Sequence, residues 1–445
     1  MSQTFDLILK GGIVVNHDGM GERDIAIRDG RIVELGHFSA DQAGESLDCT
    51  GLHILPGVID TQVHLREPGL THKEDLETGG RAAVAGGVTG VFEMPNTNPL
   101  TTSAEALADK VARATNRMYC DFAFFVGGTR ENVKHIRDLE HLPGSAGIKV
   151  FMGSSTGDLL VEDDAGVAAI LAQTCRRVAF HSEDEYRLRD RMNERIEGDA
   201  GSHPIWRDEQ VALISTQRLI RIAREAGKRI HVLHISTAEE LPLLAANKDV
   251  ASMEITPNHL TIGTPEDYAR LGSLIQMNPP VRGLRHQQAL WAAIQSGLCD
   301  VLGSDHAPHT KDEKAKTYPA SPSGMPGVQT YVPIMLNHVN EGRLSLERFV
   351  DLSSHGPARL FGIARKGRIA QGHDADFTIV DMKARRTITN DWIESRCGWT
   401  PYDGKQVKGW PIGTMLRGRK VMWQGEILGE AFGQPITFQE NPGRK

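Results

Sequence analysis

Residues 57–64, GVIDTQVH, join a short apolar run to polar side chains at alternate positions. Alternate residues of an extended strand share one face, so Asp60, Gln62 and His64 are expected to point the same way. Seven more apolar runs follow, and stretches rich in Ala, Leu, Glu and Arg follow most of them. Strands that alternate with helices indicate βα units around a parallel sheet, so the chain is predicted to be an α/β protein with a (β/α)8 barrel.

The eight predicted strands lie between about residues 56 and 362, at 57–60, 90–94, 122–126, 148–152, 178–181, 230–234, 252–256 and 301–305. Helices are expected over 103–116, with Ser103 as the N-cap, and over 216–226. Active sites of such barrels lie at the C-terminal ends of the strands. Polar residues fall there in this sequence, namely Asp60, Gln62, His64, Asn96, Lys149, His181, His234, His259, Asp305 and His309.

The two ends of the chain have a different sequence pattern from the predicted barrel. Short alternating strands and turns fill the first fifty residues, and the same pattern returns at 376–380 and 415–423. Neither part has enough strands for a core of its own, so both termini are expected to pair into one small β domain. The expected division is 1–55 and 363–445 for this domain and 56–362 for the barrel.

Composition narrows the function. The 445 residues carry 50 basic and 57 acidic side chains, a net charge of −7, without a lysine or arginine tract, which argues against nucleic-acid binding and favours a small substrate. Five cysteines without a CxxC pair argue against a disulfide framework and favour a reducing cytoplasm. No apolar run of about 18 residues and no leader pattern are found, so we expect a cytoplasmic protein that does not enter a membrane.

The polar residues at the strand ends indicate a metal site. A single histidine in such a place is more often structural, but His64, His181 and His234 occur together with Asp305, and imidazole and carboxylate groups are typical ligands of a water-activating divalent ion. Lys149 lies in an apolar run, where a buried unpaired ammonium is costly. Its side chain could reach solvent, pair with Asp305, or carry a modification that makes it an anion.

Several longer motifs are similar to those of dihydroorotases of the cyclic amidohydrolase superfamily. The resemblance covers nearly the whole chain and rests on the stretch 60–99 (DTQVHLREPGLTHKEDLETGGRAAVAGGVTGVFEMPNTNP) and on GIKVFM, HSED, HVLHIST, MNPPVR, GSDHAPH and GHDADFTIVD. It implies a (β/α)8 TIM barrel with a small β-sandwich built from both termini. It also implies a pair of zinc ions bridged by a carboxylated lysine and a hydroxide, in an enzyme of pyrimidine biosynthesis.

The resemblance also implies residue roles. His64 matches the second histidine of the family's HxH pair, Lys149 the carboxylated lysine, His181 and His234 the ligands of the second zinc, and Asp305 a ligand of the first zinc that also shuttles the proton. Substrate contacts are implied for Arg66, Asn96, Asn278, His309, Ser323 and Gly324. Because related allantoinases usually have asparagine at the position of Arg66, the arginine favours an anionic ring, namely dihydroorotate.

Gln62 departs from the family pattern, since it replaces the first histidine of the HxH pair. An amide oxygen is a weak zinc ligand because it is neutral and much less basic than imidazole. We therefore expect one or two zinc ions per subunit. The second site, with Lys149, His181 and His234, should fill normally, and the first should be held more loosely by His64, Lys149 and Asp305, with Gln62 as a weak ligand at most.

Other interpretations stay open at this point. An allantoinase or hydantoinase would use the same metal chemistry, and a non-catalytic dihydroorotase-like subunit could arise through loss of ligands such as the one at Gln62. The resemblance implies a homo-oligomer and raises aspartate carbamoyltransferase as a partner. The polar loop 310–322 could be a mobile lid or a surface loop. The charged run 183–197 is interpreted as a solvated helix face.

Overall fold

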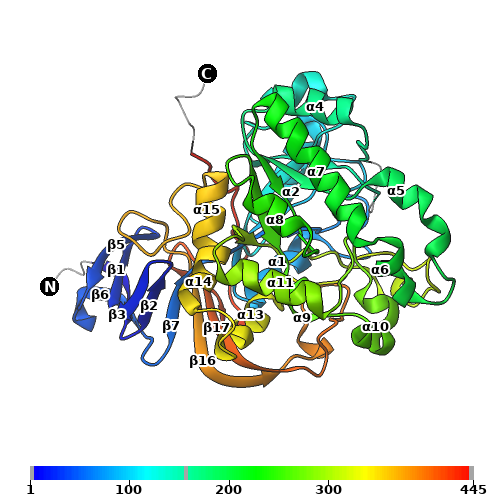
Figure 1. Cartoon of the computed structure of the whole chain (residues 1–445). Coiled ribbons are helices and arrows are strands. Elements are labelled where there is room, and N and C mark those ends of the chain that lie inside the picture. The colour runs from blue at the N-terminus through cyan, green and yellow to red at the C-terminus, as the bar shows by residue number, and fades with distance from the viewer. Residues whose placement is uncertain (1–4, 155–158, 440–445) are drawn as a thin grey trace.

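The computed structural model describes residues 5–154 and 159–439. Eight parallel strands form a nearly closed barrel in chain order. Figure 1 shows the helix-rich part of the chain at the right and strands from both ends of the chain, blue and orange, at the left. An isolated bridge between Val63 and His306 joins the first strand to the segment after the last one. The predicted α/β barrel is thus confirmed, with strands β8 (Val58–Val63), β9 (Val88–Glu93), β10 (Asp121–Gly127), β11 (Ser145–Phe151), β12 (Val178–His181), β13 (Ile230–Val232), β14 (Ala251–Ile255) and β15 (Val301–Leu302).

Helices surround the barrel, and their starts follow side-chain caps. The Ser103 hydroxyl accepts a hydrogen bond from the Ala106 amide at the start of α2, as predicted. Helix α7 begins at Glu209 rather than at Thr216, because the Asp208 carboxylate caps it by accepting from Val211. The helices are α1 (Leu76–Ala85), α2 (Ala104–Ala114), α3 (Ile136–Leu139), α4 (Asp164–Gln173), α5 (Glu185–Asp190), α6 (His203–Trp206), α7 (Glu209–Ala226), α8 (Glu240–Ala245), α9 (Pro257–Thr261), α10 (Glu266–Leu271), α11 (Leu284–Gln295), α12 (Lys311–Lys314), α13 (Tyr331–Asn340), α14 (Leu346–Val350) and α15 (Gly356–Phe361).

Two further sheets flank the barrel. One has the order β5-β4-β1-β6, and the other has the order β19-β18-β17-β16-β7-β2-β3. The second sheet mixes both ends of the chain, because β16 pairs antiparallel with β7. Leu9 and Ile27 of the first sheet share one apolar cluster with Phe377 and Met415 of the second, so the two sheets pack together. Their strands are β1 (Phe5–Lys10), β2 (Ile13–Asn16), β3 (Gly19–Glu22), β4 (Asp24–Arg28), β5 (Arg31–Gly36), β6 (Ala43–Asp48), β7 (His53–Pro56), β16 (Phe377–Thr387), β17 (Gln406–Leu416), β18 (Arg419–Trp423) and β19 (Glu426–Ile427).

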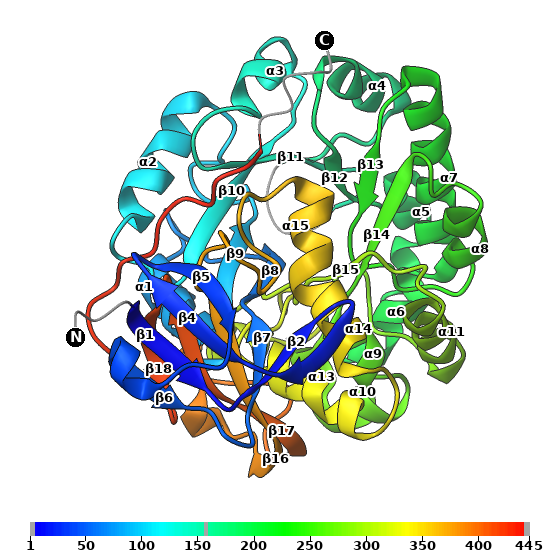
Figure 2. The ribbon, with the colours of Figure 1, turned by 90° about the vertical axis from the view of Figure 1, so that its left-hand side faces the viewer.

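The C-terminal segment closes the end of the barrel where the strands begin. Figure 2 shows this end, with α15 in its centre and the segment running beside β10. The Phe122 amide donates to the Gln434 carbonyl, and the Ile436 amide donates to the Phe122 carbonyl at 2.8 Å. Ile436 packs with Ile59 and Phe92 in an apolar cluster. Hydrocarbon therefore seals this end, and the polar chemistry must lie at the other one.

In the part of the chain that the structure describes, none of the helices combines the length and the apolar character that crossing a membrane requires.

Candidate active site

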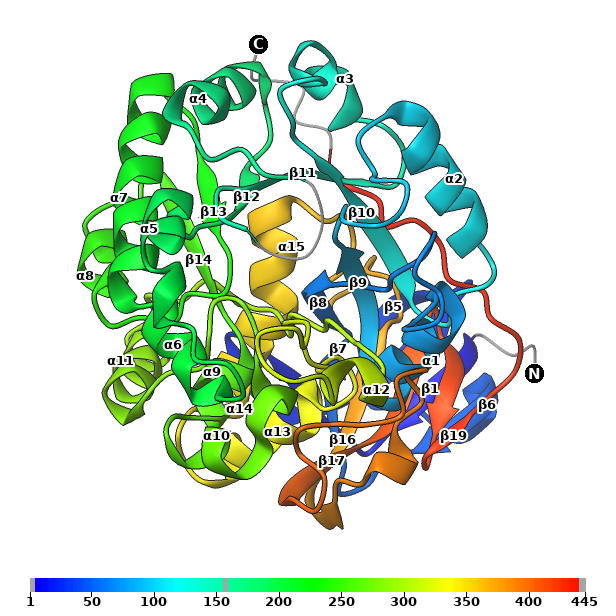
Figure 3. The same ribbon diagram turned by 90° about the vertical axis from the view of Figure 1, so that its right-hand side faces the viewer.

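The predicted site residues converge at the end of the barrel where the strands finish. Figure 3 shows the molecule from this end. The residues meet because all eight strands run in parallel, so residues at or just after the C-terminal ends share one edge. A cavity at this end is lined by Gln62, His64, Arg66, Phe151, His181, His234, Asn278, Asp305, Ala307, Ser323 and Gly324. Three other predicted residues adjoin the cavity. Asn96 and His309 contact side chains that line it, and Lys149 lies two residues before Phe151 on β11.

The first half of the site joins β8 to the loop after β15. The ring of His64 must donate from Nδ1, because its partner at 2.8 Å is the Asn96 Oδ1 atom, which only accepts. Its Nε2 lone pair therefore faces the Asp305 Oδ1 atom at 3.3 Å. Two acceptors at this separation need a proton or a cation between them. Gln62 donates from Nε2 to the same Asp305 oxygen at 3.1 Å, and its own buried Oε1 has no partner among the described residues.

The second half joins β12 to the end of β13. His181 Nδ1 lies 3.1 Å from His234 Nε2. The other nitrogen of His181, Nε2, lies 2.9 Å from the Glu183 carboxylate. The His234 Nδ1 atom is buried and lacks a hydrogen-bond partner within the described ranges. Two imidazole nitrogens thus face one another at the cavity wall, as in a pair of metal ligands.

Lys149 does not take either of the ordinary routes for a lysine in an apolar strand. Its side chain is buried, and its Nζ atom has no hydrogen-bond partner among the described residues. The Nζ atom lies over the face of the Phe151 ring, 4.4 Å from the ring centroid. Burial holds the pKa of Lys149 well below its usual value, and the charges of Asp305 and Glu254 offset this only in part. A lowered pKa favours the neutral, nucleophilic form of the amine. Of the three alternatives for Lys149, modification of the side chain therefore stays as a prediction.

The carboxyl group of Asp305 is also shifted toward its neutral form. Burial raises its pKa to about 7, although His181, Lys149 and Arg66 act in the opposite direction. Asp305 and two other site residues, Arg66 and His234, adopt positive φ angles of 49°, 64° and 39°, which is strained backbone for residues with a Cβ. A bound cation would provide a partner for the buried polar atoms that have none. It would also stabilise the ionised form of Asp305 and the lone pairs that face one another. The donor set therefore fits a divalent metal ion.

Arg66 presents a second chemical feature at the cavity. Its side chain is buried, and its Nε donates to the Pro308 carbonyl at 3.1 Å. Lys73 donates to His309 Nδ1, so His309 carries its proton on Nε2 and donates it to the Ser323 carbonyl at 3.0 Å. The Arg66 Nη2 atom, 3.2 Å from that protonated nitrogen, gains no acceptor there. The Nη groups of the Arg66 guanidinium are therefore available to bind an anion.

Some side chains of the loop 310–322 anchor it beside the site. The buried Lys314 ammonium donates to the carbonyls of Pro322 and Gly324 at 2.8 and 2.9 Å. Glu313 lies 3.1 Å from Lys73 and ties α12 to the loop after β8. Most other residues of this loop are exposed or half-buried, so the lid and the surface loop both stay predictions.

Two residues of the site were missed from the sequence. The run 183–197 was interpreted as a solvated helix face, but this is wrong for its first residues, since Glu183 and Glu185 are buried. Glu183 follows His181 at the spacing of two that places both on one side of an extended chain, which is the signal that was overlooked. His203 had no assigned role, yet it is buried and donates from Nε2 to Asn278 Oδ1 at 2.9 Å.

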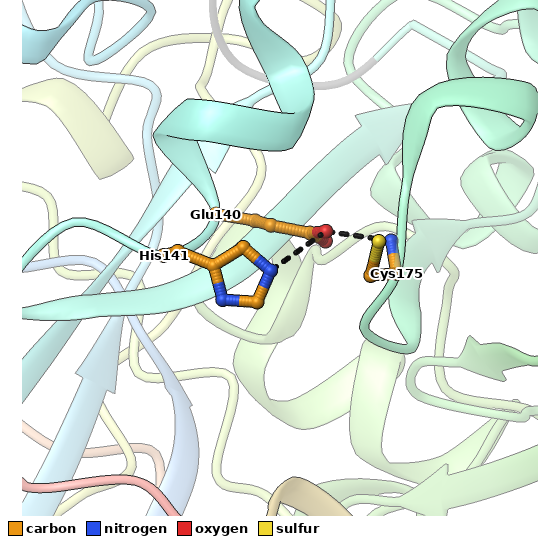
Figure 4. A group of neighbouring side chains, drawn as sticks. All are labelled: Glu140, His141 and Cys175. Carbon is orange, nitrogen blue, oxygen red and sulfur yellow. Dashed lines mark hydrogen bonds and ion pairs between the residues drawn. The ribbon is translucent and has the colours of Figure 1, made fainter. Parts of the chain in front are cut away.

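Another group with metal-ligand chemistry lies away from this site (Figure 4). Glu140, His141 and Cys175 have ligand atoms within 4.8 Å of one another. They lie in loops that lead into β11 and β12, at the opposite end of the barrel. The Glu140 carboxylate already accepts hydrogen bonds from the Cys175 and Arg176 amides at 2.6 and 3.1 Å. The hydrogen bonds to the Cys175–Arg176 turn therefore account for the buried Glu140 carboxylate without a metal ion.

Comparison with known proteins agrees with this geometry. Residues 53–421 match the model of the amidohydrolase family. A dihydroorotase of Halobacterium salinarum is 36% identical over 93% of this chain and 99% of its own length. An allantoinase of Deinococcus radiodurans is 33% identical over 97% of this chain and 98% of its own. The solved structure of an L-hydantoinase (dihydropyrimidinase) from Arthrobacter aurescens superposes with a TM-score of 0.93, at 32% identity, over 97% of this chain and 100% of its own.

Proposed function

We propose that this chain, which belongs to the amidohydrolase family and is a cyclic amidohydrolase, acts as a dihydroorotase. The reaction is the reversible hydrolysis of the ring amide of (S)-dihydroorotate to N-carbamoyl-L-aspartate, a step of pyrimidine biosynthesis. The observation that carries the proposal is the buried Arg66 at the cavity wall: its Nε donates to the Pro308 carbonyl, but its two Nη groups have no oxygen acceptor among the described residues.

The anionic ring follows from the chemistry of Arg66. A guanidinium presents two parallel donors that match a carboxylate, and in a buried site this match is stronger than that of a lysine. A neutral hydantoin or allantoin ring offers no such anion. Burial lowers the pKa of Arg66 to about 10, which still leaves the group charged at neutral pH. Dihydroorotate carries one carboxylate on its ring, and Arg66 would orient it beside Asp305.

Five residues would hold the metal: His64, Lys149 as a carbamate, His181, His234 and Asp305. A bound zinc ion would supply water activation and polarisation of the amide carbonyl. Asp305 would take a proton at its carboxylate and deliver it to the amide nitrogen as the ring opens. The raised pKa of this carboxyl, about 7, suits a group that must both accept and donate near neutral pH.

Gln62 supports the expectation of unequal metal sites. Its amide nitrogen donates to Asp305 Oδ1, so this side of the amide acts as a hydrogen-bond donor and not as a ligand. Only the unpartnered Oε1 remains to contact an ion, and a neutral amide oxygen is a weak zinc ligand. One ion at Lys149, His181 and His234 would therefore be held more tightly than a second ion at His64, Lys149 and Asp305.

A panel of substrates tests the proposal. Dihydroorotate, carbamoyl aspartate, allantoin and hydantoins are assayed with added zinc, with Asp305→Asn as the inactive control. Turnover of the first two and little turnover of the neutral rings is the expected result. Turnover confined to hydantoins or allantoin would contradict the proposed substrate. Turnover of none would favour a non-catalytic subunit.

A further inference from the structure

We propose that Glu183 is a positioning residue, which fixes the ring of His181 in one tautomer so that its Nδ1 lone pair points at the metal position shared with His234. The inference rests on the metal use that the proposed function requires. It goes beyond it by assigning a role to a residue that is not itself a ligand.

The hydrogen bond between the two residues decides the tautomer. The Glu183 Oε2 atom lies 2.9 Å from His181 Nε2. An ionised carboxylate only accepts, so the ring proton must be on Nε2. Nδ1 then carries the lone pair, and this is the nitrogen that lies 3.1 Å from His234 Nε2 at the cavity. The carboxylate thus selects which nitrogen of His181 is free to bind.

Arg207 keeps Glu183 ionised and in place. Its guanidinium donates from Nη1 to the same Oε2 atom, and both side chains are buried. The positive charge of Arg207 compensates the buried carboxylate of Glu183, and the contact holds that carboxylate beside His181. The Arg207 backbone carbonyl accepts from Arg282 Nη1 at 3.0 Å, so the segment just before α11 holds Arg207 in place.

The arrangement around the carboxylate differs from that of a plain structural ion pair. Guanidinium–carboxylate pairs are frequently bidentate, with both carboxylate oxygens engaged side by side. Here Arg207 and His181 converge on Oε2, while the buried Oε1 has no partner among the described residues. The oxygen that Arg207 engages is therefore the same one that contacts His181.

The expected consequence lies in metal affinity. A carboxylate that accepts the second ring proton of a ligating histidine fixes its orientation and makes it more basic, and loss of such a partner typically costs about 10–100-fold in metal affinity. Glu183→Gln keeps the size of the side chain and an acceptor oxygen but removes the charge. The change should therefore weaken metal binding without removing a ligand.

Chain geometry provides a matched control. Glu185 lies two residues further on and is also buried, but it accepts hydrogen bonds from Ser154 at 2.7 Å and from Arg189 at 2.9 Å and contacts no histidine in the described ranges. Glu185→Gln thus removes a buried charge from the same segment without touching His181.

The experiment measures zinc retention by the full-length protein against a competing chelator, with thermal unfolding as the check on folding. We expect Glu183→Gln to bind the tighter zinc ion about 10–100-fold more weakly than the wild type and Glu185→Gln to bind it normally. Equal retention by folded Glu183→Gln and wild type overturns the inference, as does a wild type that binds no zinc. If Glu183→Gln does not fold, Glu183→Asp replaces it, because its shorter side chain keeps the charge but withdraws from Nε2, and normal retention there also overturns the inference. Since no substrate is used, failure of the dihydroorotase assay leaves this result intact.

Discussion

The two ends of the barrel differ in chemistry: the end where the strands begin, here called the sealed end, is apolar, and the end where they finish, here called the open end, is polar. Where the strands begin, Ile59, Phe92, Phe125 and Ile436 fill the interior with hydrocarbon, and the C-terminal segment pairs with β10 through its backbone. Where the strands finish, buried polar atoms of Gln62, Lys149, Glu183 and His234 lack partners among the described residues. The first end stabilises the fold, and the second carries groups that are costly to bury.

Strained backbone and a shifted carboxyl group are found among the site residues at the open end. Left-handed backbone at Arg66, His234 and Asp305 and a carboxyl with a raised pKa belong to the open end. Such features persist only when the rest of the structure over-determines them. Substitutions at the open end should therefore change chemistry more than stability, and those at the sealed end should do the reverse.

The largest effect is expected at Asp305. Asp305→Asn removes the group that moves the proton between the attacking water and the amide nitrogen, so turnover of dihydroorotate should fall about 10²–10⁴-fold. The melting temperature should not fall, because a buried carboxyl is replaced by a neutral amide of the same shape. Steady-state kinetics and thermal unfolding measure the two quantities, and near-normal turnover would refute the assigned role.

A stability effect of similar size is expected at the sealed end. Ile436→Ala removes a buried side chain from the cluster with Ile59 and Phe92 and should lower the free energy of unfolding by about 2–5 kcal/mol. Leu284, which is 66% exposed, provides the control Leu284→Ala, expected within about 0.5 kcal/mol of wild type. Denaturant titration measures both. A large loss of kcat in folded Ile436→Ala would show that the two ends are not separate in function.

Arg66 tests the anion specificity of the open end. Arg66→Met removes a charge-assisted hydrogen bond worth about 1.5–3 kcal/mol, so kcat/KM for dihydroorotate should fall about 10–100-fold. Any slow turnover of a neutral hydantoin should change much less, because that ring makes no use of the charge. A parallel loss for both substrates would mean that Arg66 supports the fold of the site and does not select the anion.

The smallest effect is a change in the pH dependence of stability at Asp60. Burial raises the pKa of this carboxyl to about 7, and hydrogen bonds from Ser304 and Gln62 offset this only in part. The folded state therefore holds a proton that the unfolded state has lost between about pH 4 and 7, and stability falls as pH rises through that window. Asp60→Asn should flatten the decline between pH 5 and 8 by on the order of 1–3 kcal/mol, measured by denaturant titration at each pH. An unchanged slope would contradict the shifted pKa.

Patterns of short range determined what the sequence could predict. Eight apolar runs with polar ends sufficed for the barrel and its C-terminal edge, because strand order follows chain order. The grouping of His64, Lys149, His181, His234 and Asp305 followed from the same rule. Contacts across long sequence separations could not be read in this way. The spacing of two from His181 was a local signal for Glu183, but its burial against Arg207, 24 residues away, was not visible in the charged run. The packing of Ile436 depends on β10, more than 300 residues earlier.

The central claim is that the open end of the barrel is a metal-dependent active site. An anomalous difference map collected at the zinc absorption edge, from crystals of protein purified without chelator, tests it most directly. The account predicts a strong peak between Lys149, His181 and His234, with a weaker one near His64 and Asp305. A map without a peak there, or with its only peak at Glu140, His141 and Cys175, would contradict it.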